Sequence, residues 1–114
     1  VFDLEEDVAS LRPRLDLVAT LDALGVIATA PGRKVDFVSR FFAPSVGVPE
    51  DPVTGSTHCT LTPYWGARLS KEKMLARQLS ERGGVIHCEY RGERVTIGGE
   101  ATLYLRGEIE VPRA

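Results

Sequence analysis

The sequence predicts an α+β domain in which a meander of short strands packs around one buried helix. The run from Pro52 to Ala67 contains no Asp, Glu, Lys or Arg, and a helix without a charged face is normally buried on every side. After Ser70 the pattern changes to short strands separated by glycine-containing turns. A chain of 114 residues is long enough for one modest core, so we expect a single domain over residues 1–114.

Two short peripheral helices are predicted before the first strand. Residues 3–6 have the form of a capping box, which predicts a helix over residues 4–11 with Asp3 as its N-cap. A second helix is predicted from residue 14 or 15 to residue 24, followed by Gly25 as its C-terminal stop. Its apolar stripe is formed by Leu17, Leu21 and Leu24. We expect this helical pair to cover one edge of the sheet.

The remaining elements follow from apolar runs and their breaks. Strands are predicted over residues 25–30, 36–42, 74–79, 85–90, 95–97 and 101–111. Large apolar side chains fall on both faces of the second strand, so we expect it to be covered on both sides. Residues 43–52 are rich in proline and glycine and form a loop, and the buried helix is predicted over residues 54–68.

The candidate chemistry lies where this loop enters the buried helix. Glu50 and Asp51 are adjacent, and in an extended loop at most one of two neighbouring side chains faces a site. Thr54, Gly55 and Ser56 suit a helix entrance, where free backbone N–H groups and the positive end of the helix dipole can bind a carboxylate. The same pattern also fits a surface carboxylate pair followed by an ordinary capped helix.

Composition excludes several classes of function. A net charge of −2 offers no basic excess, so we expect no nucleic-acid partner. Neither a membrane-spanning run nor a leader is recognisable, and we expect a soluble cytoplasmic protein with no membrane partner.

The start at Val1 without a methionine suggests a truncated or processed polypeptide. His58 and His87 lack the spacing and further ligands of a metal site, so no metal is expected.

The two cysteines are too few for a disulfide framework, and both are expected to be reduced and buried. Cys59 lies nearly one turn inside the predicted helix, which favours packing over catalysis. His58 has two interpretations: it points toward the site, or it is a satisfied interior histidine, which is the more common case.

Three blocks of sequence carry a family resemblance. The segment 50–56 reads EDPVTGS and is followed by His58 and by Pro63-Tyr64-Trp65; residues 35–44 and 76–84 flank it in order. Together they resemble the C-terminal half of the PhzF (phenazine biosynthesis-like) proteins, which belong to the diaminopimelate-epimerase-like superfamily. The resemblance implies one half of a two-domain fold, in which each half is a strongly curved, mostly antiparallel sheet closed around a central helix.

The resemblance also implies a chemistry, cofactor-free proton transfer that isomerises a small carboxylate-bearing substrate. Asp51 matches the family's carboxylate that contacts the reacting part of the substrate. Gly55 and Ser56, with Thr54 beside them, match the helix start that binds the substrate carboxylate, and Glu50 and His58 are further candidates. The best-known substrate of the family is a dihydro-hydroxyanthranilate.

The principal acid/base of the family is a glutamate of the other half, and it has no counterpart in this sequence. The resemblance therefore implies that a second half-domain or a homodimer mate completes the site. A different class of function remains open from the residues alone: a non-catalytic module that binds a small anion or drives dimerisation.

Overall fold

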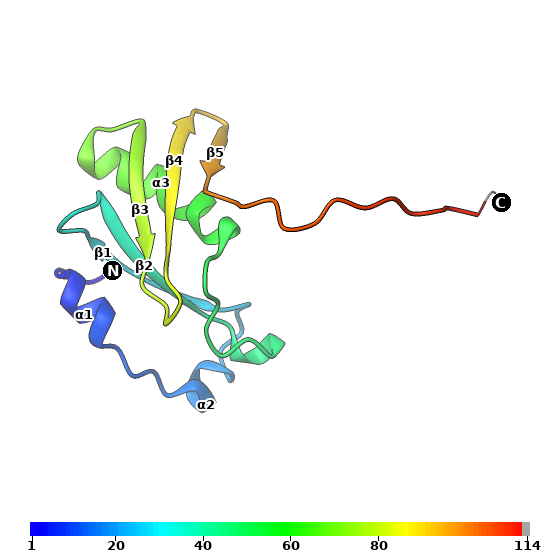
Figure 1. The fold of residues 1–114 in the computed structure, drawn as a ribbon. Coiled ribbons are helices and arrows are strands. Elements are labelled where there is room, and N and C mark those ends of the chain that lie inside the picture. The colour runs from blue at the N-terminus through cyan, green and yellow to red at the C-terminus, as the bar shows by residue number, and fades with distance from the viewer. Residues whose placement is uncertain (113–114) are drawn as a thin grey trace.

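The computed structural model describes residues 1–112, which fold around one five-stranded sheet with the strand order β1-β2-β3-β4-β5. The strands are β1 Val26–Pro31, β2 Phe37–Phe42, β3 Lys73–Gln78, β4 Gly84–Arg91 and β5 Arg94–Gly98. The helices are α1 Glu5–Ser10, α2 Leu15–Val18 and α3 Gly55–Leu69, with a short 3₁₀ turn, η1, at Pro44–Val46. The α+β class and the mostly antiparallel sheet are confirmed (Figure 1).

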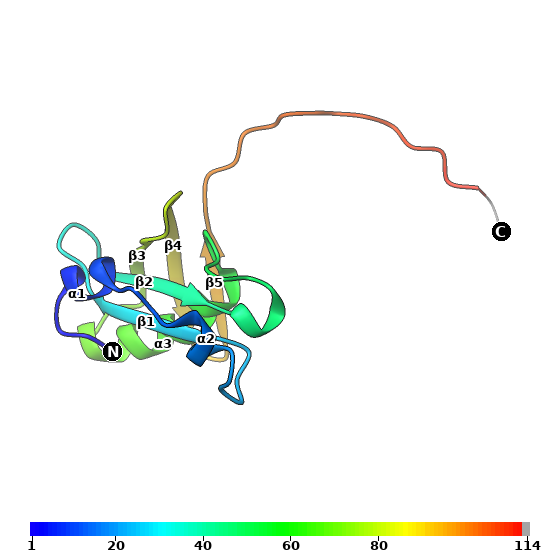
Figure 2. The ribbon, with the colours of Figure 1, turned by 90° about the horizontal axis from the view of Figure 1, so that it is seen from below.

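The sheet is covered on both faces, as Figure 2 shows for α1 and α3. On the α3 face, Phe37 of β2 packs with Leu61 and Trp65 of the helix and with side chains of β3 and β4. On the α1 face, Val38 of β2 packs with Val8 and with β1. Successive residues of β2 thus enter different cores, because side chains alternate across a strand. The expectation of a strand covered on both sides is confirmed.

One connection in this sheet is not a hairpin. β2 and β3 are parallel, with Ser39 opposite Gln78, and the chain joins them through η1 and α3. A parallel pair requires such a crossover, and the carboxyl ends of the two strands then lie at the same edge of the sheet. The candidate loop leaves β2 at this edge.

The exposure of α3 corrects one expectation. Its inner side is buried against the sheet, but Ser56, Cys59 and Thr60 are exposed. α3 carries one Lys, Arg, Asp or Glu residue, the exposed Arg68 in its last turn. Its outer side is nevertheless not buried among residues 1–112, because the sheet contacts it from one direction. The helix runs through Pro63.

The N-terminal region differs from its prediction in three ways. Leu4, not Asp3, precedes the first helix, and its backbone N–H donates to Asp7 Oδ2 at 3.2 Å. The second helix has only the four residues of α2, so the predicted stripe of leucines at positions 17, 21 and 24 is exposed rather than packed. α1 covers a face of the sheet, not an edge, because Val8 is its buried contact with the core beside β1 and β2.

The last predicted strand, residues 101–111, is also different. The chain leaves β5 as an extended segment that pairs with no strand of residues 1–112 (Figure 1). Within the same range, no helix is both long enough and apolar enough to cross a membrane.

Arg40 of β2 ties α1 to the sheet and to the crossover loop. Its Nε and Nη2 donate to the two carboxylate oxygens of Glu50 at 2.7 and 2.9 Å. Its Nη1 donates to the carbonyls of Val8 and Leu11 at 3.2 and 3.0 Å, at the C-terminal end of α1. The Glu50 carboxylate holds the pKa of the Arg40 guanidinium above its usual range. A guanidinium satisfies both sets of acceptors because its donors form a planar fork.

Replacing Arg40 with methionine should destabilise the fold by about 3 kcal/mol, because the change leaves a largely buried carboxylate and helix-end carbonyls without a donor. Urea unfolding followed by circular dichroism measures this. Arg33→Met is the matched control: Arg33 pairs with Glu6 on the surface, so little change is expected. Equal effects of the two substitutions would contradict the role assigned to Arg40.

Candidate functional site

The candidate loop is bonded to the edge where β2 and β3 end. The backbone N–H of Asp51 donates to the carbonyl of Phe41 at 3.0 Å, which holds the loop beside β2. On the β3 side, Ser80 Oγ donates to the carbonyl of Pro52 at 2.7 Å. The segment 51–54 is therefore fixed from both strands before α3 begins.

Gln78 is the central fixing group of this segment. It is the last residue of β3, and its side chain is fully buried. Its Oε1 accepts from the backbone N–H of Thr54 at 2.8 Å, while its Nε2 donates to the carbonyl of Asp51 at 2.7 Å and to Thr54 Oγ1 at 3.0 Å. One amide thus bonds both ends of the turn that leads into the helix.

The Asp51 carboxylate is oriented by Thr54, the N-cap residue of α3. The Thr54 hydroxyl donates to Asp51 Oδ2 while it accepts from Gln78. Hydrogen bonds therefore lead from the buried amide of Gln78 through the Thr54 hydroxyl to the Asp51 carboxylate, and the Asp51 residue is half-buried. Such a chain restricts the rotation of the carboxylate and leaves its other oxygen, Oδ1, for another partner.

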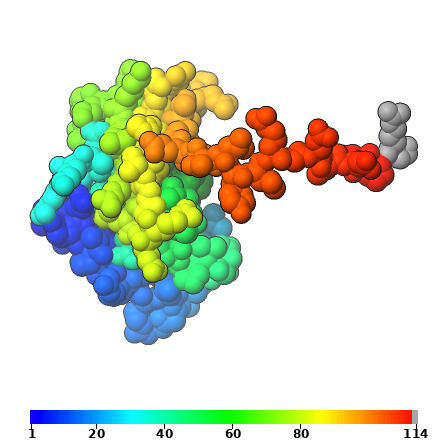
Figure 3. Space-filling model, in the orientation of Figure 1, coloured from blue at the N-terminus to red at the C-terminus, as the bar shows by residue number. Residues whose placement is uncertain are grey.

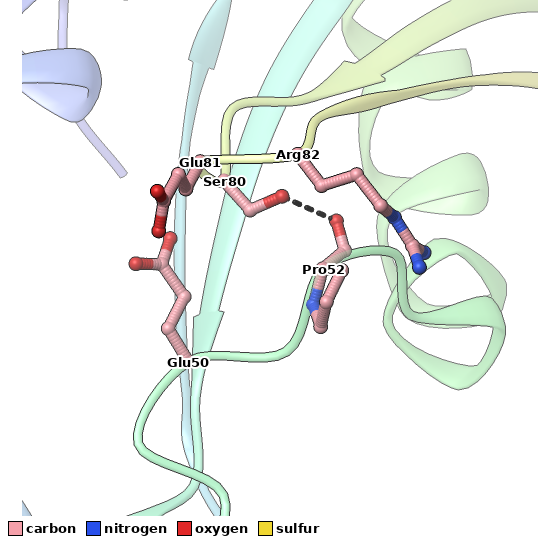
Figure 4. A pocket seen from close by; sticks show the side chains of 5 residues that line it. All are labelled: Glu50, Pro52, Ser80, Glu81 and Arg82. Atoms are coloured by element: carbon pink, nitrogen blue, oxygen red, sulfur yellow. Dashed lines mark hydrogen bonds between the residues drawn. The ribbon is translucent and has the colours of Figure 1, made fainter.

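Two hollows are lined by residues that lie close to Asp51 in the sequence. The first has a volume of about 490 Å³ and is lined by Glu50, Pro52, Ser80, Glu81 and Arg82 (Figure 4). In that view Ser80 and Pro52 lie in the middle, Glu50 and Glu81 on one side and Arg82 on the other. Asp51 itself lines neither hollow: Glu50 and Pro52 line the first, and Val53 and Gly55 line the second.

The second hollow lies at the entrance of α3 and has a volume of about 750 Å³. Gly55, the first residue of the helix, lines it together with Val53 and Arg82. Four more glycines line it: Gly83, Gly84, Gly98 and Gly99. A ligand can approach the backbone of a glycine more closely than that of other residues, and a helix start is a favourable place for an anion. Ser56 follows Gly55 and is exposed.

Glu50 points away from Asp51, as two neighbours in an extended loop must. Both its oxygens bind Arg40, so its role in this chain is to hold α1 and the loop together. His58 is also an interior group. It is fully buried, its Nδ1 donates to the carbonyl of Thr54 at 2.8 Å, and its ring stacks on Phe37. Its Nε2 is 3.4 Å from Ser39 Oγ and accepts from that hydroxyl.

The protonation of His58 follows from this burial. Desolvation lowers the pKa of its imidazole, and the hydrogen bond to Thr54 opposes the shift without cancelling it. The ring is therefore neutral near pH 7, and it supports the first turn of α3 from inside.

The cysteines differ from each other. Cys88 is buried, and burial raises the pKa of its thiol, so it is a core residue as expected. Cys59 is exposed on the outer side of α3, which corrects the expectation of burial. Both thiols are free. Among residues 1–112 no group of three or more His, Cys, Asp or Glu side chains is arranged to bind a metal ion.

Sequence reasoning missed Gln78, Ser80 and Arg82. A signal for Gln78 exists: Met74, Ala76 and Gln78 alternate on the buried side of β3, and a glutamine at the end of such a series needs buried partners. The sequence around Arg82 predicts only a turn. Arg82 and Gly55 line the same hollow because the turn after β3 lies near the start of α3, which no local sequence pattern indicates.

The family of phenazine biosynthesis-like proteins, PhzC-PhzF, matches residues 1–107. The chain belongs to this family. An uncharacterised isomerase of Pseudomonas aeruginosa is 51% identical over 111 residues, a match that covers 97% of this chain and 42% of that protein. The mouse phenazine biosynthesis-like domain-containing protein 2 is 48% identical over 113 residues, covering 93% of this chain and 39% of that protein.

Solved structures agree with the PhzF family assignment. A PhzF-family phenazine biosynthesis protein from Enterococcus faecalis superimposes with a TM-score of 0.86 at 47% identity, over 97% of this chain and 43% of that chain. A PhzC/PhzF protein from Clostridium difficile gives a TM-score of 0.85 over 96% of this chain and 43% of that one, also at 47% identity. The chain thus spans about two-fifths of the length of the relatives it matches.

Gln78→Met should destabilise the protein by about 3 kcal/mol, because it leaves the buried N–H of Thr54 and the carbonyl of Asp51 without their partner. Arg77→Met, one residue earlier on the exposed side of β3, is the control and should have little effect. Urea unfolding gives both values. If the two variants were equally stable, the turn would not depend on the Gln78 amide.

Stability should also depend on His58 through pH. The unfolded chain binds a proton at this residue near pH 6.5, whereas the folded chain resists it, because burial lowers the folded pKa. The stabilisation of the folded state by the neutral His58 ring is therefore fully present above about pH 6.5. It is lost as the pH falls from there through the lowered pKa of the folded state.

Urea unfolding between pH 8 and pH 5 measures this loss. His58→Gln should flatten the slope in that window, and His87→Gln, at an exposed position, should retain it. A slope that survives in the His58 variant would show that another group causes it.

Proposed function

We propose that this chain is the C-terminal, substrate-orienting part of a PhzF-like isomerase that moves a proton on a small carboxylate-bearing substrate without a cofactor. The observation that carries the proposal is the Asp51 carboxylate, held by Thr54 and Gln78 beside the entrance of α3. Two relatives, from Pseudomonas aeruginosa and Halalkalibacterium halodurans, are named as uncharacterised isomerases, which supports the reaction class.

The assigned chemistry follows from that position. A C–H bond next to an activating group breaks, its proton passes to a carboxylate, and the electron pair moves into the conjugated system of the substrate. The proton then returns at another carbon, so the product is an isomer and no oxidant or reductant is needed. We assign Asp51 Oδ1 to contact with the reacting part of the substrate, because Oδ2 is already bonded to Thr54.

The substrate carboxylate would be bound at the second hollow. There the N–H groups of Gly55 and Ser56 stand at the start of a fifteen-residue helix, and Arg82 adds a positive charge to the same wall. The glycine-lined wall accommodates a ligand close to the backbone. Glu100 also lines this hollow, so the attraction for a small anion would come from the helix start and from Arg82.

We further propose that a second half, from another polypeptide segment or a mate, supplies the opposing acid/base and closes the sheet more completely around α3. The exposed outer side of α3 and the length of the relatives support this. A purely anion-binding or dimerising module would use the same helix entrance, but it gives no reason for the ordered hydrogen bonds that end at Asp51.

Asp51→Asn should reduce solvent-proton exchange into a dihydro-hydroxyanthranilate by about 10²- to 10⁴-fold, because the amide cannot accept the proton. The protein tested is a chimaera in which the part of the Pseudomonas relative outside the match is joined to this chain. Deuterium uptake from heavy water is followed by mass spectrometry, and circular dichroism checks the fold.

Asp16→Asn is the control for this experiment. Asp16 lies on α2 and pairs with Arg14 on the surface, so exchange should equal that of the unmodified chimaera. Undiminished exchange in the Asp51 variant would remove Asp51 from the reaction.

A further inference from the structure

The hydrogen bonds around Asp51 have a fixed direction, because two backbone groups decide it. The Thr54 N–H can only donate, and the Asp51 carbonyl can only accept. Gln78 Oε1 lies 2.8 Å from that N–H, and Gln78 Nε2 lies 2.7 Å from that carbonyl oxygen. The orientation of the Gln78 amide is therefore set, since a flipped amide would place donor against donor and acceptor against acceptor.

The direction of the Thr54 hydroxyl follows from this amide. Gln78 Nε2 donates its second hydrogen to Thr54 Oγ1 at 3.0 Å, so the hydroxyl oxygen is an acceptor there. A threonine hydroxyl has one hydrogen of its own, and that hydrogen is donated to Asp51 Oδ2. Thr54 is only 8% exposed, so water does not readily replace either partner.

Thr54 is also held as a whole. Its N–H is bonded to Gln78, its hydroxyl to Gln78 and Asp51, and its carbonyl accepts from His58 Nδ1 at 2.8 Å. The turn after β3 lies beside the loop before α3 at the surface (Figure 3), and there Ser80 Oγ donates to the carbonyl of Pro52. Every polar group of Thr54 thus has a partner, which prevents the hydroxyl from turning away from Asp51.

The Asp51 carboxylate has two different oxygens as a result. Oδ2 is an obligatory acceptor, because a proton on it would meet the hydrogen of the Thr54 hydroxyl and leave a donor without a partner. Oδ1 takes no part in this series of bonds. The arrangement therefore fits an Asp51 that is ionised before substrate arrives and that receives a proton or a hydrogen bond at Oδ1.

We propose that Gln78 and Thr54 are positioning residues that determine which oxygen of Asp51 reacts. Oδ2 stays an acceptor throughout, and any proton that Asp51 takes up, or any hydrogen bond that it accepts from substrate, is at Oδ1. The Thr54 hydroxyl then has no hydrogen for the substrate, whose carboxylate is left to the N–H groups of Gly55 and Ser56. The kinetic consequence rests on the proposed function, but the direction of the bonds can be tested without substrate.

The substrate-free test uses the Asp51→Asn variant of this chain. The introduced amide should turn its oxygen to the Thr54 hydroxyl and its NH₂ group outward, where the hydrogens exchange freely with water. The Gln78 NH₂ group, which uses both its hydrogens in buried bonds, should exchange at least about tenfold more slowly. Nitrogen-15-resolved NMR in heavy water measures both groups. Slow exchange of the introduced NH₂ group that becomes fast on adding Thr54→Val would show the opposite direction and overturn the proposal.

The kinetic test compares two substitutions of Thr54 in the chimaera described above. Thr54→Val keeps the shape but removes the hydroxyl, and it should lower kcat for proton exchange about 10- to 100-fold with little change in KM. Thr54→Ser restores the hydroxyl and should restore most of the activity. The Thr54 side chain donates to or accepts from no backbone N–H of α3, so valine leaves the helix start intact.

Thr57→Val is the matched control. Thr57 lies in the first turn of the same helix, is 2% exposed, and its hydroxyl has no hydrogen-bond partner among the described residues. Removing that hydroxyl should leave both kcat and the unfolding midpoint at or above their wild-type values.

The outcomes separate this inference from the proposed function. If Asp51→Asn abolishes exchange while Thr54→Val keeps the wild-type kcat, Asp51 remains in the reaction and the positioning role is overturned. Equal losses with Thr54→Val and Thr54→Ser would overturn it too, because packing rather than the hydroxyl would then matter. Undiminished exchange in Asp51→Asn would overturn both. If Thr54→Val does not fold, as judged by circular dichroism, the NMR measurement still decides the direction of the bonds.

Discussion

The candidate site depends on one buried amide. Gln78 bonds both the carbonyl of Asp51 and the N–H and hydroxyl of Thr54, and so it sets the turn by which the crossover enters α3. A buried polar group is costly unless every partner is present, so the arrangement is stable only when the loop, the helix start and the end of β3 are all in place. The orientation of the Asp51 carboxylate follows from that condition.

The two adjacent carboxylates illustrate how an extended backbone separates roles. Glu50 turns to Arg40 and joins the crossover loop to α1 on one face of the sheet, while Asp51 turns to Thr54 at the helix entrance. His58 supports the same entrance from the interior through the carbonyl of Thr54. Structural bonds thus surround the assigned carboxylate, and they restrict its motion without competing for both of its oxygens.

Two parts of the chain are unusually exposed: the outer side of α3, and the segment 101–111 with its apolar side chains Leu103, Leu105 and Ile109. Both are features of a domain whose matched relatives are more than twice as long. The hydrophobic effect does not favour leaving those apolar side chains in water. The same partner polypeptide that would cover them is the one that we propose to supply the opposing acid/base, so assembly and chemistry would be coupled through one interface.

The sequence by itself determined the α+β class, five of the six predicted strands, the loop that carries Asp51, and the long helix with Thr54 and Gly55 at its start. Those features depend on side-chain periodicity and on the backbone limits of proline and glycine, which are local. Only the tertiary structure decided that Glu50 binds Arg40, that His58 lies inside, that Cys59 is exposed, and that Gln78 and Arg82 join the site. These partners lie up to several tens of residues apart, and sheet register and the crossover bring them together; no local pattern contains that information.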